Sequence, residues 1–167
     1  HCRIAKCCKN SIKAVFSSTL AAWSVLSHVD NPLLPADVQE IERWIWRVLN
    51  RVDYINGADP SLASNRNNQR YLLATIMMQV GLLYESEYYV HRALYEASLI
   101  GDQMRGDGSL PLETSRGSLA LHYTGHASGS LVTLAELASL LGYDLYEHPA
   151  VRIREAMDFF SRSLRDP

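Results

Sequence analysis

The sequence predicts an all-α fold in which helical hairpins form part of an (α/α) toroid, an incomplete α/α barrel. Over most of the chain, apolar residues recur at three- and four-residue steps, which is the period of an amphipathic helix. No segment alternates in the manner of a β-strand, and no repeat of fixed period indicates a tetratricopeptide-type array. The predicted helices are apolar enough to be sandwiched between neighbours, which favours the toroid.

Six helices are expected, separated by segments rich in glycine, proline, aspartate and asparagine. Five of them span about residues 11–28, 37–50, 67–83, 87–104 and 115–141. A sixth follows His148-Pro149, where proline suits a first helical turn, and runs to about Leu164. Asp37 is suited to cap the second helix, and Gly142 to follow the end of the fifth.

The bulk composition excludes several classes of protein. At 167 residues, the chain is expected to form a single domain, residues 1–167, with residues 1–10 as a mobile end. A net charge of −2 leaves no basic excess for nucleic acid, and charged residues interrupt every apolar run before membrane-spanning length. Cys2, Cys7 and Cys8 form a poor disulfide framework and lack partners at zinc-site spacing.

Arg116 and Tyr123 are the strongest candidates for chemistry. They lie seven residues apart on the predicted fifth helix, so their side chains should share one face. A polar cluster, Asn67-Asn68-Gln69, stands at the start of the third helix. Together these groups suit the removal of a proton beside a sugar carboxylate, because Arg116, Asn68 and Gln69 can donate hydrogen bonds to it. Tyr123 can serve as the base, and as the acid if it returns the proton.

Each of these residues also has an ordinary structural interpretation. Arg116 can form a surface ion pair with Glu113, and Tyr123 can be a core aromatic residue. Asn67 is favoured as a helix cap. Trp46 is expected to be exposed, where it could stack on a sugar ring, whereas Trp44 is expected in the core. The acidic residues show no glycosidase-type pairing, which disfavours hydrolysis.

Two motifs resemble the alginate lyases of polysaccharide lyase family 5. The first is Asn67-Asn68-Gln69-Arg70-Tyr71, followed by an apolar helix. The second is Asp107-Gly-x-Leu-Pro-x-Glu113-x-x-Arg116, followed by Ala120-Leu-x-Tyr123. The resemblance covers roughly residues 38–160 and is strongest over 107–136; it corresponds to the C-terminal half of the family fold.

The resemblance implies a periplasmic or secreted enzyme that cleaves polymannuronate or a similar acidic polysaccharide by β-elimination, without a metal or organic cofactor. Asn68 and Arg116 would neutralise the carboxylate, and Tyr123 would be the catalytic acid and base. Asn67, Arg70 and Trp46 are the candidates for further contacts with the sugar chain. Either the other half of the fold is absent, or the chain is a fragment of a longer protein. A half-toroid would expose apolar helix faces, so we expect self-association.

The chain departs from the family pattern at two positions. Gln69 stands where the family has a histidine, and glutamine cannot accept a proton at neutral pH. Thr124-Gly125-His126 replaces His-Asn-Tyr after the tyrosine. His126 lies three residues beyond Tyr123, on nearly the same helix face, and we hypothesise that it restores proton transfer. The alternative is a catalytically silent relative or fragment that binds acidic polysaccharide or scaffolds a partner.

Overall fold

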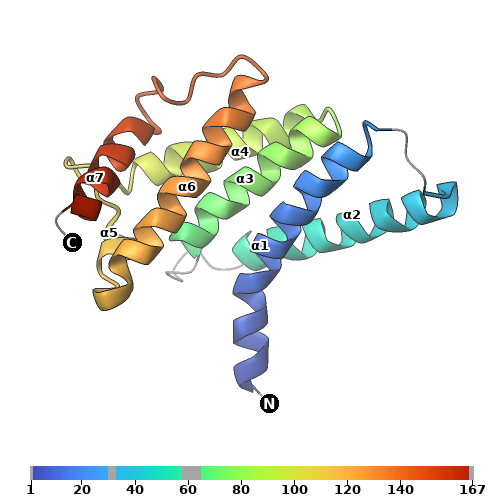
Figure 1. Cartoon of the computed structure of the whole chain (residues 1–167), viewed down its shortest axis with the longest axis horizontal. Helices are drawn as coiled ribbons and strands as arrows, with labels where there is room; N and C mark the ends of the chain where they lie inside the picture. The colour runs from blue at the N-terminus through green and yellow to red at the C-terminus, as the bar shows by residue number, and fades with distance from the viewer. Residues whose placement is uncertain (1, 30–32, 58–64, 166–167) are drawn as a thin grey trace.

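The structure, a computed structural model, describes residues 2–29, 33–57 and 65–165. Within these ranges every regular element is helical, which confirms the predicted all-α fold (Figure 1). The elements are α1 (Cys2–Leu26), α2 (Pro35–Gly57), α3 (Asn68–Leu83), α4 (Glu87–Gly101), α5 (Pro111–Thr114), the 3-10 turn η2 (Gly117–Leu119), α6 (Ala120–Ser139) and α7 (Ile153–Arg165). None of these helices is both long enough and apolar enough to span a membrane.

Helix α3 is the centre of the molecule. It packs against α4 on one side and against α6 and α1 on the others, while α7 covers α6 (Figure 1). Because three helices surround it, α3 is apolar on nearly all sides rather than amphipathic. Gly81 allows the close approach of α4, since a Cβ atom there would lie 2.7 Å from Cγ2 of Val90. The central helix thus brings residues of α1, α3 and α6 together at its N-terminal end.

Two polar contacts tie the neighbouring helices to α3. The hydroxyl of Ser17 on α1 donates to Oε1 of Gln79 at 2.9 Å, and Nε2 of Gln79 donates to the Ser17 carbonyl at 3.2 Å. The Thr75 hydroxyl donates to the carbonyl of Ser130 on α6 at 3.0 Å. These pairs satisfy polar groups that are partly buried (Ser17, Gln79) or buried (Thr75) between the helices. They fix α1 and α6 on either side of α3.

The predicted helix boundaries were partly wrong at both ends of the chain. The helical backbone of α1 extends to Cys2, through the residues expected to form a mobile end. The last helix begins at Ile153 rather than directly after Pro149, because Arg152 has a φ of 56° and breaks the helical path before it. The predicted loop 56–65 lies mostly outside the described residues.

The predicted fifth helix is interrupted where the sequence motif is richest. Instead of a continuous helix from Ser115, α5 ends at Thr114, η2 spans Gly117–Leu119 and α6 begins at Ala120. Gly117 has a φ of +57°, which glycine adopts readily and L-residues rarely do. Arg116 therefore precedes α6 and does not share a helix with Tyr123.

The exposure of the two tryptophans of α2 is the reverse of what the sequence predicted. Trp44 is 38 % exposed, whereas Trp46 packs against the rings of Tyr84 and Tyr89, with centroids 4.9 and 6.0 Å away. Among the α2 residues whose side chains the structure describes, the fully buried ones are Ile45, Leu49 and Val52. The inward side of α2 is therefore centred on these positions, and its flank next to α3 and α4 carries Trp46.

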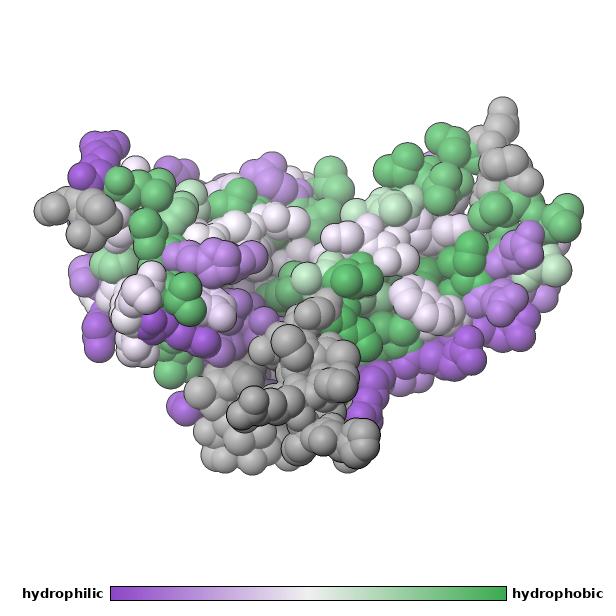
Figure 2. All heavy atoms as spheres, turned by 60° about the horizontal axis from the view of Figure 1, so that its bottom comes forward, coloured by the Kyte–Doolittle hydropathy of each residue, from purple (hydrophilic) through white to green (hydrophobic). Residues whose placement is uncertain are grey.

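Apolar side chains gather where α1 leads into α2, at the right of Figure 2. The exposed apolar residues in this region are Val25, Leu26, Val29, Leu33 and Leu34. Such a patch is typical of a surface that another molecule or segment covers. The expected self-association stays a prediction.

Candidate active site

A cavity of about 470 Å³ lies between α1, α3 and α6. It brings together four of the predicted site residues, Asn68, Gln69, Tyr123 and His126. A neighbouring cavity of about 520 Å³ lies further along α6 and shares some of the same lining residues. The residues common to both cavities are Ser17, Leu72, His126 and Ser130. We call the two cavities together the groove.

The guanidinium of Arg116 lies over the face of the Tyr123 ring, 4.2 Å from its centroid. Nε of Arg116 donates to the Leu112 carbonyl at 3.0 Å, which holds the side chain against the end of α5. The expected juxtaposition is thus present, although one shared helix face does not produce it. A cation over an aromatic face is stabilised by the ring quadrupole. This contact fixes the Tyr123 ring at the wall of the groove.

The loop before α5 is held so that Arg116 reaches this position. Gly108 has a φ of +86°, and a Cβ atom there would lie 2.0 Å from the Glu155 carbonyl oxygen, so only glycine fits. Oδ1 of Asp107 accepts from the backbone N–H of Ser109 at 2.9 Å, and the nearby hydroxyl of Ser109 together with this N–H lowers the pKa of Asp107. Pro111 opens α5 at its first turn. Asp107, Gly108 and Pro111 all belong to the second motif.

Glu113 is the most important residue that the sequence interpretation underrated. The sequence suggested a surface ion pair with Arg116, but the side chain of Glu113 is completely buried. Its Oε1 accepts from the backbone N–H of Asn68 at 2.7 Å, and its Oε2 lies 3.7 Å from Nε of Arg116. Burial raises the pKa of Glu113, opposed by the Asn68 N–H and the Arg116 charge. Its place in the second motif was the only sequence signal for this role.

The start of α3 carries the amide cluster. Asn67 caps the helix: its Oδ1 accepts from the backbone N–H of Gln69 at 3.0 Å, which confirms the capping interpretation. Oε1 of Gln69 is buried and has no hydrogen-bond partner among the described residues. Asn68 lies in the first turn and lines the groove beside it. The two amides are thus presented by a rigid helix end.

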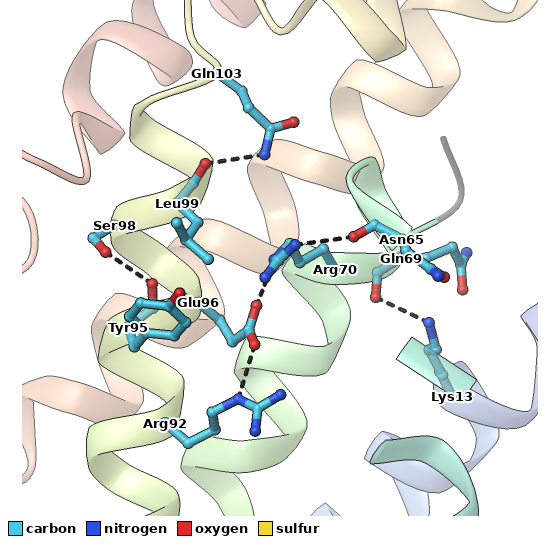
Figure 3. Close-up of polar contacts among 10 residues, drawn as sticks. All are labelled: Lys13, Asn65, Gln69, Arg70, Arg92, Tyr95, Glu96, Ser98, Leu99 and Gln103. Atoms are coloured by element: carbon cyan, nitrogen blue, oxygen red, sulfur yellow. Dashed lines mark hydrogen bonds and ion pairs between the residues drawn. The ribbon is translucent and has the colours of Figure 1, made fainter. Parts of the chain in front are cut away.

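Lys13 is a second residue that the sequence interpretation missed. It lies on α1, is only 2 % exposed, and its Nζ donates to the backbone carbonyl of Gln69 at 3.3 Å (Figure 3). Burial lowers the pKa of Lys13 to about 8. The only sequence signal was its position as the single Asp, Glu, Lys or Arg of the predicted helix 11–28.

Arg70 and Trp46, two predicted sugar contacts, do not line either cavity. Arg70 is ion-paired through Nε with Glu96 of α4, and its Nη1 donates to the Asn65 carbonyl at 3.2 Å (Figure 3). Arg92 also donates to the same carboxylate, at 2.9 Å. Glu96 is almost fully buried, so this network joins α3 to α4 inside the molecule.

His122 is a third missed residue. The ring centroids of His122 and Tyr123, neighbours on α6, are 5.3 Å apart. The His122 and His126 rings are 4.6 Å apart at right angles, one turn apart on α6, and both line the groove. The groove therefore has two exposed imidazoles beside Tyr123.

The described residues include no group of three or more histidine, cysteine, aspartate or glutamate side chains placed to hold a metal ion. The side chains of the three cysteines lie outside that description. The expectation of a reaction without metal or cofactor stays a prediction.

Comparison with known proteins identifies relatives of one kind. Residues 8–167 match the alginate lyase family model. A polysaccharide lyase from Stenotrophomonas maltophilia (strain K279a) is 39 % identical over 83 residues, which are 48 % of this chain and 24 % of that protein.

Solved structures share the fold. A variant of alginate lyase A1-III complexed with a tetrasaccharide superposes with a TM-score of 0.82 at 22 % identity, over 95 % of this chain and 46 % of that one. Alginate lyase A1-III from Sphingomonas species A1 gives 0.75 at 21 % identity, over 95 % and 45 %. The chain thus spans less than half the length of these relatives, and its fold corresponds to part of their toroid. From the family match over nearly all of its length, the chain belongs to the alginate lyase family.

Proposed function

We propose that the chain acts as a polysaccharide lyase on β-1,4-linked uronate polymers of the alginate or polymannuronate type. The observation that carries the proposal is the meeting of Tyr123 and Asn68 in one cavity, with the Arg116 guanidinium stacked on the tyrosine ring. Family membership supports the same reaction class. A periplasmic or secreted location, where such polymers occur, is part of the proposal.

The reaction is a β-elimination in which the substrate carboxylate must accept negative charge. Asn68 and Gln69 line the cavity and offer amide donors to that carboxylate. Arg116 lines neither cavity, but its guanidinium lies over the Tyr123 ring, from where its charge stabilises the negative charge that develops. Tyr123, as the phenolate, removes the proton at C5. The C4–O bond then breaks, a C4–C5 double bond forms, and the phenol returns its proton to the departing glycosidic oxygen.

Gln69 and His126 share the tasks that a single histidine performs in the family pattern. Gln69 can donate a hydrogen bond but cannot take a proton. His126 lines the same cavity as Tyr123 and Gln69, so an imidazole is within the groove that the substrate would enter. We assign it a part in proton transfer with Tyr123.

The test is a spectrophotometric assay with polymannuronate, polyguluronate and other polyuronates. The wild-type chain is expected to produce absorbance from the 4,5-unsaturated product on at least one polymer. Tyr123→Phe, which keeps the ring beneath Arg116 and removes the hydroxyl, is expected to abolish it. No product on any polyuronate would contradict the lyase.

A second candidate is a catalytically silent relative that binds acidic polysaccharide or scaffolds a partner. Gln69 in place of histidine and the partial length of the chain favour it. Calorimetric binding of an oligomannuronate without any unsaturated product would support this candidate.

A further inference from the structure

Glu113 connects the two elements that supply the proposed carboxylate-binding groups. One oxygen of its carboxylate accepts from the backbone N–H of Asn68 at 2.7 Å. The other lies 3.7 Å from Nε of Arg116. Asn68 is 45 residues away in the sequence, so this contact joins the start of α3 to the α5–α6 junction. No local helix geometry would bring these groups together.

The burial of Glu113 is costly, which calls for a reason beyond packing. Its side chain is 0 % exposed, and Oε2 has no hydrogen-bond partner among the described residues. A buried carboxylate is destabilising unless charge and hydrogen bonds compensate, and an apolar residue of similar volume often stabilises a fold more. Burial also raises the pKa of this group, so the compensation is incomplete. Perturbed pKa values of this kind are common at functional sites.

We propose that Glu113 is a positioning residue, which holds Asn68 and Arg116 at the separation that a uronate carboxylate requires. Its carboxylate orients the backbone of Asn68 from one side and attracts the guanidinium that stacks on Tyr123 from the other. Glu113 lines neither cavity of the groove, so it acts through these two residues. The inference rests on the proposed function.

Glu113→Gln separates the charge of this residue from its volume. Glutamine can still accept from the Asn68 N–H, but it no longer attracts Arg116. We expect kcat on a polyuronate to fall on the order of 10- to 100-fold, because a small displacement of a catalytic group costs that much. The melting temperature should stay at the wild-type value or rise, whereas a merely structural role would lower it. Glu113→Asp, which keeps the charge, should recover part of kcat.

Glu155→Gln is the matched control. Glu155 and Arg152 form an ion pair of the same i, i+3 kind, with Nε and Oε1 3.2 Å apart, but the Glu155 side chain on α7 is 46 % exposed and lies outside the groove. We expect its kcat and KM to equal those of the wild type.

A double-mutant cycle tests whether Glu113 acts through Arg116. In an Arg116→Ala background, Glu113→Gln should cause little further loss of kcat. Independent structural damage would instead give losses that multiply. Multiplying losses, or a wild-type kcat in Glu113→Gln, would overturn the positioning role.

Binding distinguishes this inference from the proposed function. Calorimetry with an oligomannuronate in the Tyr123→Phe background measures affinity without turnover. If the wild type makes no product but Glu113→Gln weakens binding, the lyase fails and the positioning role stands. If product forms and Glu113→Gln changes neither kcat nor affinity, the lyase stands and the positioning role fails. Neither product nor binding in the wild type would overturn both.

Discussion

Arg116 precedes α6, yet its guanidinium lies 4.2 Å from the centre of the Tyr123 ring on that helix. The break at Gly117 makes this possible, because it lets the arginine turn back over the first part of α6. The contact between Arg116 and Tyr123 is therefore a tertiary one. It depends on both the planarity and the charge of the guanidinium.

Replacing Arg116 tests that geometry. Arg116→Lys keeps the charge but loses the planar group that stacks on the ring, so we expect kcat/KM on a polyuronate to fall on the order of 10-fold. Arg116→Ala should lower it further, because the charge is lost as well. Arg43→Lys, at an exposed site on α2, is the control and should keep wild-type activity. Full activity in Arg116→Lys would show that stacking is unimportant.

Gln69→His should raise the lyase rate. A histidine at this helix start would bring an imidazole that can both donate and accept a proton into the cavity that Tyr123 lines. General acid–base groups typically contribute at least about 100-fold, and we expect at least a 10-fold rise in kcat because His126 already supplies part of the role. An unchanged or lower kcat in a variant of wild-type melting temperature would count against the assignment of Gln69.

His126→Ala should lower activity far more than His148→Ala. His126 lines the groove, whereas His148 is exposed in the segment before α7, where its Nδ1 accepts from the backbone N–H of Ala150. A loss of about 100-fold in kcat is expected for His126→Ala if it takes part in proton transfer. Equal effects of the two substitutions would remove His126 from the mechanism.

Lys13 should make stability depend on pH in the alkaline range. Burial lowers its pKa from 10.5 to about 8, so between these values the unfolded chain binds more protons than the folded one. The free energy of unfolding should therefore rise between pH 8 and 10.5, by on the order of 3 kcal/mol from this group. This contribution is present above pH 10.5 and lost as the pH falls through 8.

Lys13→Met should not show this rise in the free energy of unfolding between pH 8 and 10.5. Urea unfolding of the wild type and the variant across pH 7–10.5 measures it as a difference, in which the tyrosines common to both cancel. Arg43→Met removes an exposed charge and should follow the wild-type curve. Parallel curves for the wild type and Lys13→Met would contradict the inferred pKa of Lys13.

The sequence pattern predicted the helical class and the central helix well, because apolar spacing reflects burial directly. The cap at Asn67 was accessible from its local sequence, and the meeting of Asn68 with Tyr123 from the family resemblance. The pattern missed the break before α6, since the predicted helix 115–141 runs through Gly117, whose positive φ interrupts it.

Charged residues were harder to place. Periodicity assigns a charged side chain to the surface, and it gave no means of recognising Glu113 and Lys13 as buried. Their burial depends on partners that are distant in the sequence, at Asn68 and Gln69. Arg70 illustrates the converse, since a motif residue expected to contact sugar is bound to the buried carboxylate of Glu96.

The most direct measurement of the central claim is the absorbance of unsaturated product from polymannuronate, compared between the wild type and Tyr123→Phe. The wild type should generate product, and the variant should generate none while it still binds an oligomannuronate with similar affinity. Product formation by Tyr123→Phe at the wild-type rate, or no product from the wild type on any polyuronate, would contradict the account.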